Sequence, residues 1–71
     1  MTDNEALDII RAQGHAAGTP EARTGFVRVW IRGGDESVDV RLGTELHELA
    51  SGRLLIDEIR ERRQYEEVLE R

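Results

Sequence analysis

The feature that most constrains the fold is a pair of alternating segments on either side of two adjacent glycines. Both segments that flank Gly33-Gly34, residues 26–32 and 35–42, have aliphatic side chains at every second position. Such alternation is typical of a β-strand with one buried face, and glycines readily take the positive φ angles of a two-residue hairpin turn. We therefore predict an antiparallel β-hairpin that turns at Gly33-Gly34.

The charges select the register of this hairpin. A two-residue turn places Val29 opposite Val38 and Arg28 opposite Asp39, whereas a four-residue loop would place Arg28 opposite Arg41. Opposite charges across a strand pair are favourable and like charges unfavourable, each by about 0.2–1 kcal/mol. The register of the two-residue turn is therefore predicted.

A short helix is predicted over residues 1–14. Thr2 and Glu5 have the spacing of a capping box, in which each side chain accepts a hydrogen bond from the other residue's backbone N–H. Gly14 is suited to end this helix in a left-handed conformation. Residues 15–25 then contain two glycines and the only proline, and we expect them to be a flexible linker.

The C-terminal segment, residues 44–71, is predicted as one long helix with Thr44 as its N-cap. The alternative is a helix that is interrupted at Ser51-Gly52, because glycine often ends helices. The predicted element order is thus α-β-β-α, an α+β fold. Its first part, residues 1–25, holds the N-terminal helix and the linker, and its second part, residues 26–71, holds the hairpin and the C-terminal helix.

A chain of 71 residues without cysteine needs stabilisation beyond its own core. Domains below about 70–80 residues rarely gain more than about 3–5 kcal/mol from a single core, and disulfides are impossible here. A continuous helix over residues 44–71 would be roughly 42 Å long and would extend past the hairpin. We expect a homodimer, formed by pairing of hairpin edges or by packing of the C-terminal helices. The candidate interface residues are Leu55, Ile59, Tyr65, Val68 and Leu69.

The hairpin has one apolar face and one mixed face. The aliphatic side chains of both strands share the apolar face, which we expect to pack under the C-terminal helix. The mixed face combines two of the three aromatic residues with arginines, and we expect Trp30 to stack with Arg28 and Arg32. Aromatic and arginine side chains are typical of protein-binding hot spots and of surfaces that stack single-stranded bases. The candidate binding residues are Phe26, Arg28, Trp30, Arg32 and Arg41.

The net charge of −5 favours a protein partner over a nucleic acid, because nucleic-acid affinity depends largely on neutralising phosphates. We therefore expect a dimeric protein-interaction or accessory module. The alternative is a nucleic-acid-binding module that uses the aromatic and arginine side chains of the hairpin. No apolar run is long enough to cross a membrane, and the first residues lack the basic start of a signal peptide. A cytoplasmic protein without membrane contact is expected.

The sequence contains no pattern typical of a catalytic or metal site. It has no cysteine, and it lacks a Walker loop, a nucleophile elbow and the paired-histidine zinc motif. His47 precedes Glu48, but Ser51 stands where that zinc motif needs its second histidine. We expect no enzyme, no cofactor and no metal; a metal shared between subunits through His47 and Glu48 is the alternative. His15 is expected in the linker without a chemical role.

Two short motifs follow one another in a distinctive order. Arg28-Val-Trp-Ile31, a glycine turn and a second strand precede Ala50-x-Gly52-x-Leu54-Leu55-x-Asp57. This order resembles a family of small, uncharacterised bacterial proteins with an Arg-Val-Trp-Ile strand and an Ala-Trp-Gly-x-Leu-Leu-x-Asp helix. The resemblance covers roughly residues 26–60, with Ser51 where the family has tryptophan. It implies an α+β hairpin-plus-helix fold, no catalytic residue, and a position for Gly52 inside a helix at a close contact.

Overall fold

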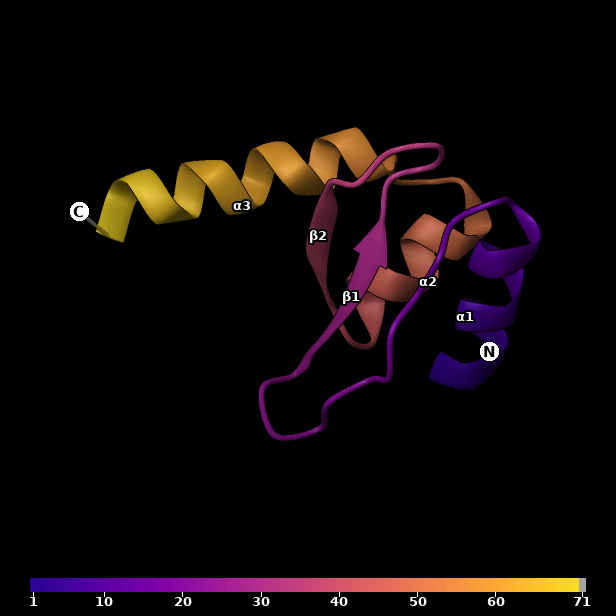
Figure 1. Ribbon diagram of the computed structural model, residues 1–71. Coiled ribbons are helices and arrows are strands. Elements are labelled where there is room, and N and C mark those ends of the chain that lie inside the picture. The colour runs from indigo at the N-terminus through magenta and orange to yellow at the C-terminus, as the bar shows by residue number, and fades with distance from the viewer. Residues whose placement is uncertain (71) are drawn as a thin grey trace.

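The computed structural model describes residues 1–70, and residue 71, the predicted end of the last helix, lies outside them. Five elements follow one another along the chain (Figure 1). They are α1 (Asp3–Ala12), β1 (Phe26–Trp30), β2 (Ser37–Arg41), α2 (Thr44–Ser51) and α3 (Ile56–Glu70). The fold is α+β, as predicted, with a two-stranded antiparallel hairpin between helices. The predicted single C-terminal helix is wrong, because that segment forms two helices.

The predicted register of the hairpin is confirmed, but the predicted turn is wrong. Val29 pairs with Val38 and Arg28 with Asp39. The strands end at Trp30 and Ser37, so the connection is longer than Gly33-Gly34. Only Gly33 of the two has a positive φ, 75°, whereas a type I′ turn needs two such residues. Instead, the Gly34 N–H donates to the Ile31 carbonyl and forms a four-residue turn at the tip.

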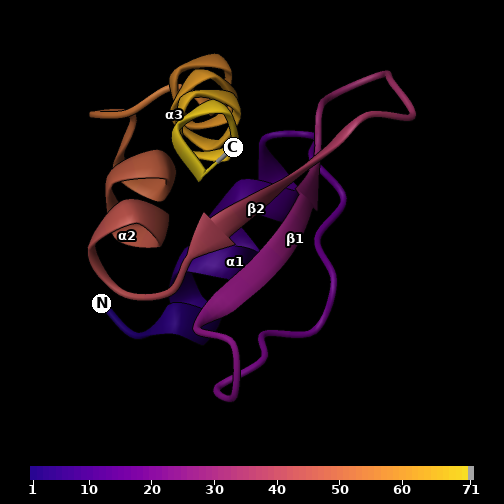
Figure 2. The same ribbon diagram turned by 90° about the vertical axis from the view of Figure 1, so that its left-hand side faces the viewer.

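The segment between α1 and β1 lies along the free edge of β1 (Figure 2). The Trp30 N–H donates to the Ala16 carbonyl at 2.8 Å, and the Gly18 N–H donates to the Arg28 carbonyl at 2.8 Å. Further along, the Glu21 N–H donates to the Phe26 carbonyl. These bonds satisfy three of the backbone groups of β1 that point away from β2. The flexibility expected of residues 15–25 stays a prediction.

Both ends of α1 follow the sequence prediction. Thr2 and Glu5 form the complete capping box, and the hydrogen bonds from Thr2 hold the pKa of the Glu5 carboxyl below its usual value. At the other end Gln13 is the cap, and Gly14 follows with a φ of 102°. The Gly14 N–H donates to the Arg11 carbonyl and the His15 N–H to the Ile10 carbonyl, the bond pair of a Schellman motif.

Gly52 ends α2, which corrects both the continuous helix and the position implied by the family resemblance. Its φ is 83°, and a Cβ built there would have no neighbour within 4 Å, so it makes no close contact inside a helix. The Gly52 N–H donates to the Leu49 carbonyl and the Arg53 N–H to the Glu48 carbonyl. Thr44 is likewise not the N-cap, because Gly43 occupies that position without a side-chain cap.

Substituting Gly52 with alanine is expected to lower the free energy of unfolding by about 1–2 kcal/mol, because an L side chain is strained in the left-handed region. If the glycine stood inside a continuous helix, the same change would raise stability by about 0.5–1 kcal/mol. Unfolding in urea, monitored by circular dichroism, shows whether the free energy of unfolding falls or rises. Ser51→Ala, one residue earlier on an exposed position, is the matched control, with an expected change within about 0.5 kcal/mol.

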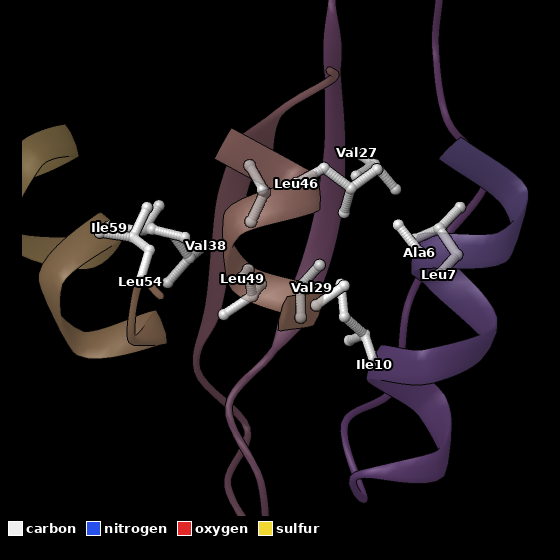
Figure 3. Close-up of a cluster of buried hydrophobic side chains, with 12 residues drawn as sticks. Ala6, Leu7, Ile10, Val27, Val29, Val38, Leu46, Leu49, Leu54 and Ile59 are labelled. Atoms are coloured by element: carbon white, nitrogen blue, oxygen red, sulfur yellow. The ribbon is translucent and has the colours of Figure 1, made fainter. Parts of the chain in front are cut away.

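The core lies between the apolar face of the hairpin and all three helices (Figure 3). Each strand contributes two buried valines, and each helix contributes side chains that are almost completely buried. The partly buried Ile31 and Leu42 pack against this cluster. The predicted apolar face is therefore confirmed, but α1 and α2 share with α3 the role that was expected of one long helix. The core residues are Ala6, Leu7, Ile10, Val27, Val29, Val38, Val40, Leu46, Leu49, Ala50, Leu54 and Ile59.

Candidate functional site

The face of the hairpin opposite the core, here called the outer face, comprises Phe26, Arg28, Trp30, Ser37, Asp39 and Arg41. Phe26 and Trp30 are half-buried, and Arg28 and Arg41 are exposed. Arg32, also predicted for this face, lies beyond the end of β1 in the connection to β2. Arg28 forms an ion pair with Asp39 at 3.6 Å, as the register predicts. Both side chains are about half-exposed, so the pair contributes only about 0–1 kcal/mol.

The aromatic side chains of the outer face do not have the neighbours that were predicted. The guanidinium groups of Arg41 and Arg63 lie 5.1 Å and 5.5 Å from the centre of the Phe26 ring. The described residues show no such contact at Trp30 with Arg28 or Arg32. A Cβ built on Gly18 would lie 3.7 Å from the Trp30 ring, so the segment beside β1 contacts the indole. Trp30 is thus partly covered by its own chain, which reduces the surface it offers to a partner.

A buried carboxylate at the start of α2 was not predicted from the sequence. Glu45 is only 7% exposed, and its two oxygens have different partners. Oε1 accepts from the Arg41 backbone N–H at 2.9 Å, and Oε2 accepts from the Arg63 guanidinium at 2.9 Å. Arg63 Nε and Nη1 are buried without a hydrogen-bond partner among the described residues. Glu45 therefore links β2, α2 and α3 at one point.

The sequence carries little signal for this link. Glu45 stands in the first turn of α2, where an acidic residue is ordinary because of the helix dipole. Arg63 lies 18 residues later on a helix rich in charge, and only the break at Gly52 turns α3 back toward the start of α2.

The second half of α3 extends away from the other elements (Figure 1). Tyr65, Val68 and Leu69 are each about two-thirds exposed, and Leu55, which precedes the helix, is 61% exposed. Ile59, which was expected at the same interface, is instead fully buried in the core. Four of the five candidate interface residues are therefore accessible.

A groove lies between β2 and α3. It is a cavity of about 380 Å³, and we call it the β2–α3 groove. At one end Arg60 donates to Glu36 at 2.8 Å, and this hydrogen bond raises the pKa of the Arg60 guanidinium. Its lining residues are Glu36, Ser37, Val38, Asp39, Arg60, Arg63, Gln64, Glu66 and Glu67. A second hollow of about 580 Å³ lies on the outer face beside Glu21 and Thr24.

Both histidines lie within hydrogen-bond distance of a residue in another element. His47 Nε2 and Asp3 Oδ1 are 2.9 Å apart, and the Gly43 N–H donates to the same Asp3 oxygen, so this carboxylate connects α1 with the start of α2. His15 Nδ1 lies 3.1 Å from the Trp30 carbonyl oxygen. Within residues 1–70, no group of three or more histidine or carboxylate side chains is placed to hold a metal ion. No helix of that part of the chain is both long and apolar enough to cross a membrane.

The family resemblance suggested by the two sequence motifs stays an expectation. No family model matches the chain, and neither a curated protein nor a solved structure matches it.

Proposed function

We propose that the protein is a non-catalytic protein-interaction module that forms a homodimer through the projecting half of α3. The observation that carries this proposal is the exposed stripe of Tyr65, Val68 and Leu69, which have the i, i+3, i+4 spacing of one helix face. Three large apolar side chains on one face of a helix that leaves the body of the domain are costly in water. A second copy of the same helix would cover them.

The charges along α3 favour an antiparallel arrangement of the two helices. Arg62 and Arg63 lie in its middle, and Glu66 and Glu67 follow toward its end. A two-fold axis near Tyr65 brings the exposed Arg62 of one copy close to Glu66 of the other, whereas a parallel pair brings like charges together. The stripe is short, so the interface is at the small end of protein–protein contacts, and we expect a dissociation constant in about the micromolar range.

Val68→Lys is expected to prevent this association. In the antiparallel arrangement Val68 faces Arg62 of the second copy, so the new ammonium group removes apolar contact and adds like-charge repulsion. Sedimentation equilibrium over the micromolar range measures the effect. The unmodified chain is expected to rise from 8.1 kDa toward twice that mass, while Val68→Lys stays at the lower value.

The matched control is Ser51→Lys, which adds the same charge at an exposed position of α2, away from the stripe. This variant is expected to associate as the unmodified chain does. A folded chain that remains monomeric up to high micromolar concentration would overturn the dimer. Equal behaviour of the two lysine variants would show that the stripe is not the interface.

The nucleic-acid alternative has no specific observation in its favour. Among the arginines proposed for it, Arg28 is paired with Asp39, and Arg41 lies over the Phe26 ring. Trp30, the ring that would stack a base, is half-buried beside Gly18. The outer face thus offers neither a row of unpaired cations nor a fully open ring, which single-strand binding uses.

A further inference from the structure

Residues 16–21, here called the strap, cover the edge of β1 that points away from β2 (Figure 2). Three backbone hydrogen bonds hold the strap there, two of 2.8 Å and one of 3.1 Å. They join Ala16 to Trp30, Gly18 to Arg28, and Glu21 to Phe26. An uncovered strand edge can pair with other chains, and natural domains usually protect it. The strap therefore protects this edge of the hairpin.

The strap adds little apolar surface to the core. Ala17 packs against the core cluster, but its side chain is small and only partly buried. Ala16, Thr19 and Glu21 are exposed. Each of the three hydrogen bonds contributes a small net free energy, and holding the segment in place costs conformational entropy of comparable size. The closed strap is therefore only marginally favoured over an open one.

Helix α1, which precedes the strap, is fixed to α2 by contacts of its own. At its start the Asp3 carboxylate lies 2.9 Å from His47 Nε2, and just after its end the Gln13 side chain donates to the Ala50 carbonyl at 3.3 Å. Between these two contacts, one face of the helix is buried in the core. Opening of the strap would therefore leave α1 in its place.

A glycine lies on either side of the strap. Gly14, which follows α1, has a φ of 102°, and Gly25, which precedes β1, has a φ of 78°. The Gly25 carbonyl accepts from the Leu42 N–H at 2.8 Å, so Gly25 is held by the hairpin itself. Glycine changes its backbone angles at little steric cost. The strap can therefore leave β1 by backbone rotations on either side of it, while α1 and the hairpin keep their positions.

Trp30 is the residue that an open strap uncovers most. A Cβ built on Gly18 would lie 3.7 Å from the indole, so the strap backbone passes over the ring. The Trp30 N–H donates to the Ala16 carbonyl, and the Trp30 carbonyl oxygen lies 3.1 Å from His15 Nδ1. With the strap open, the ring and these backbone groups become accessible together. A strand edge with free backbone groups is what an extended segment of a partner protein pairs with.

We propose that the strap opens and closes on β1 while the rest of the domain stays folded, and that this movement controls access to Trp30 and to the edge of β1. The closed strap blocks strand pairing at this edge, and the open strap permits it. The movement involves a different surface from the Tyr65 stripe of the proposed dimer. The strap and the dimer can therefore fail independently.

Hydrogen exchange of single backbone amides measures the opening. Gly25 and Ile31 are joined to β2 by backbone hydrogen bonds, so Val29, which has the same parity along the strand, also directs its N–H to β2. The N–H groups of Gly18 and Trp30, by contrast, are held by the strap bonds. We expect these two to be protected at least about tenfold less than the Val29 N–H. Their exchange should also depend little on urea below the unfolding transition, because local opening exposes little surface.

Two substitutions of Gly18 shift the strap in opposite directions. Gly18→Pro removes the N–H that donates to the Arg28 carbonyl, and should speed exchange of the Trp30 N–H about fivefold. Gly18→Ala places a methyl group 3.7 Å from the Trp30 ring, an ordinary contact, and reduces the freedom of the open strap. It should slow the same exchange about two- to fivefold. Acrylamide quenching of Trp30, the only tryptophan in the chain, should rise in the proline variant and not in the alanine variant.

Circular dichroism shows whether each variant is folded. Equal protection and equal urea dependence of the Trp30 and Val29 amides would overturn the opening, because only global unfolding would then expose the edge. Failure of Gly18→Ala to slow exchange at Trp30 would overturn it as well, and this measurement remains decisive even where Gly18→Pro does not fold. Fast exchange at Trp30 that is independent of urea, in a chain that stays monomeric, supports the strap and removes only the proposed dimer.

Discussion

Glu45→Ala is expected to lower the free energy of unfolding by about 3–5 kcal/mol, the typical cost of leaving a buried charge without its partner. Its carboxylate is 7% exposed and is the nearest anion to the Arg63 guanidinium, at 2.9 Å. Alanine at position 45 leaves that guanidinium inside the protein, where two of its nitrogens already lack a hydrogen-bond partner among the described residues. It also removes the acceptor of the Arg41 N–H.

Such a loss is comparable with the whole stability expected of a domain of this size, which is about 3–5 kcal/mol. The variant is therefore expected to be largely unfolded at 25 °C by circular dichroism, and to refold in an osmolyte such as trimethylamine oxide. The unmodified chain under the same conditions provides the folded baseline. Chemical denaturation in the presence of the osmolyte then yields the difference in free energy of unfolding.

A double variant distinguishes the buried charge from the volume of the side chain. Glu45→Met combined with Arg63→Met replaces the pair by apolar groups of similar length, a change that is often neutral or stabilising. Recovery of most of the lost stability in this double variant supports the argument. Arg62→Ala is the surface control, because Arg62 is about half-exposed and lies 3.6 Å from the same oxygen. The prediction would be contradicted if Glu45→Ala lowered the free energy of unfolding by no more than Arg62→Ala does.

Ile59→Ala is expected to lower the free energy of unfolding by about 2–5 kcal/mol, the usual effect of truncating a large aliphatic core side chain to alanine. Ile59 is completely buried, and Figure 3 shows it directed toward Val38 and Leu54. It is the only residue of α3 whose side chain belongs to the fully buried part of the core among those described. The loss of this contact should release α3 from β2.

The measurement is denaturation at a concentration well below that of any association. An interface residue would affect the oligomeric state and leave the stability of the monomer unchanged, whereas a core residue destabilises the monomer itself. Leu55→Ala is the control, because Leu55 is 61% exposed and only four positions away. We expect that control to change stability by no more than about 0.5 kcal/mol. Equal effects of the two alanines would place Ile59 outside the core.

Local patterns predicted the parts of the fold that depend on neighbouring residues. The alternation and the charges around the hairpin specify its register, and the structure pairs Arg28 with Asp39 as expected. Thr2 and Glu5 specify the start of α1, because both hydrogen bonds of the capping box lie within four residues. The hairpin tip was mispredicted because adjacent glycines permit several turns, and only Gly33 took a positive φ.

The break between α2 and α3 could not be predicted from local sequence patterns. Ser51-Gly52 is compatible with a continuous helix and with a terminus, since glycine is tolerated in the first and favoured in the second. Burial of Leu54 and Ile59 against the hairpin requires the chain to turn after α2, and this tertiary requirement selects the terminus. The same turn brings Arg63 to Glu45, a contact between residues that no helical spacing relates.

The sequence by itself therefore determined the hairpin, its register, its apolar face and the first helix, because their interactions are local and repeat with the period of the backbone. Tertiary structure alone decided that Ile59 lies in the core, that Glu45 and Arg63 form a buried pair, and that residues 16–21 close one edge of the hairpin. It also decided that α3 packs beside the other strand of the hairpin, β2. These features depend on how separate elements meet in space, where burial and charge pairing act between residues far apart in the chain.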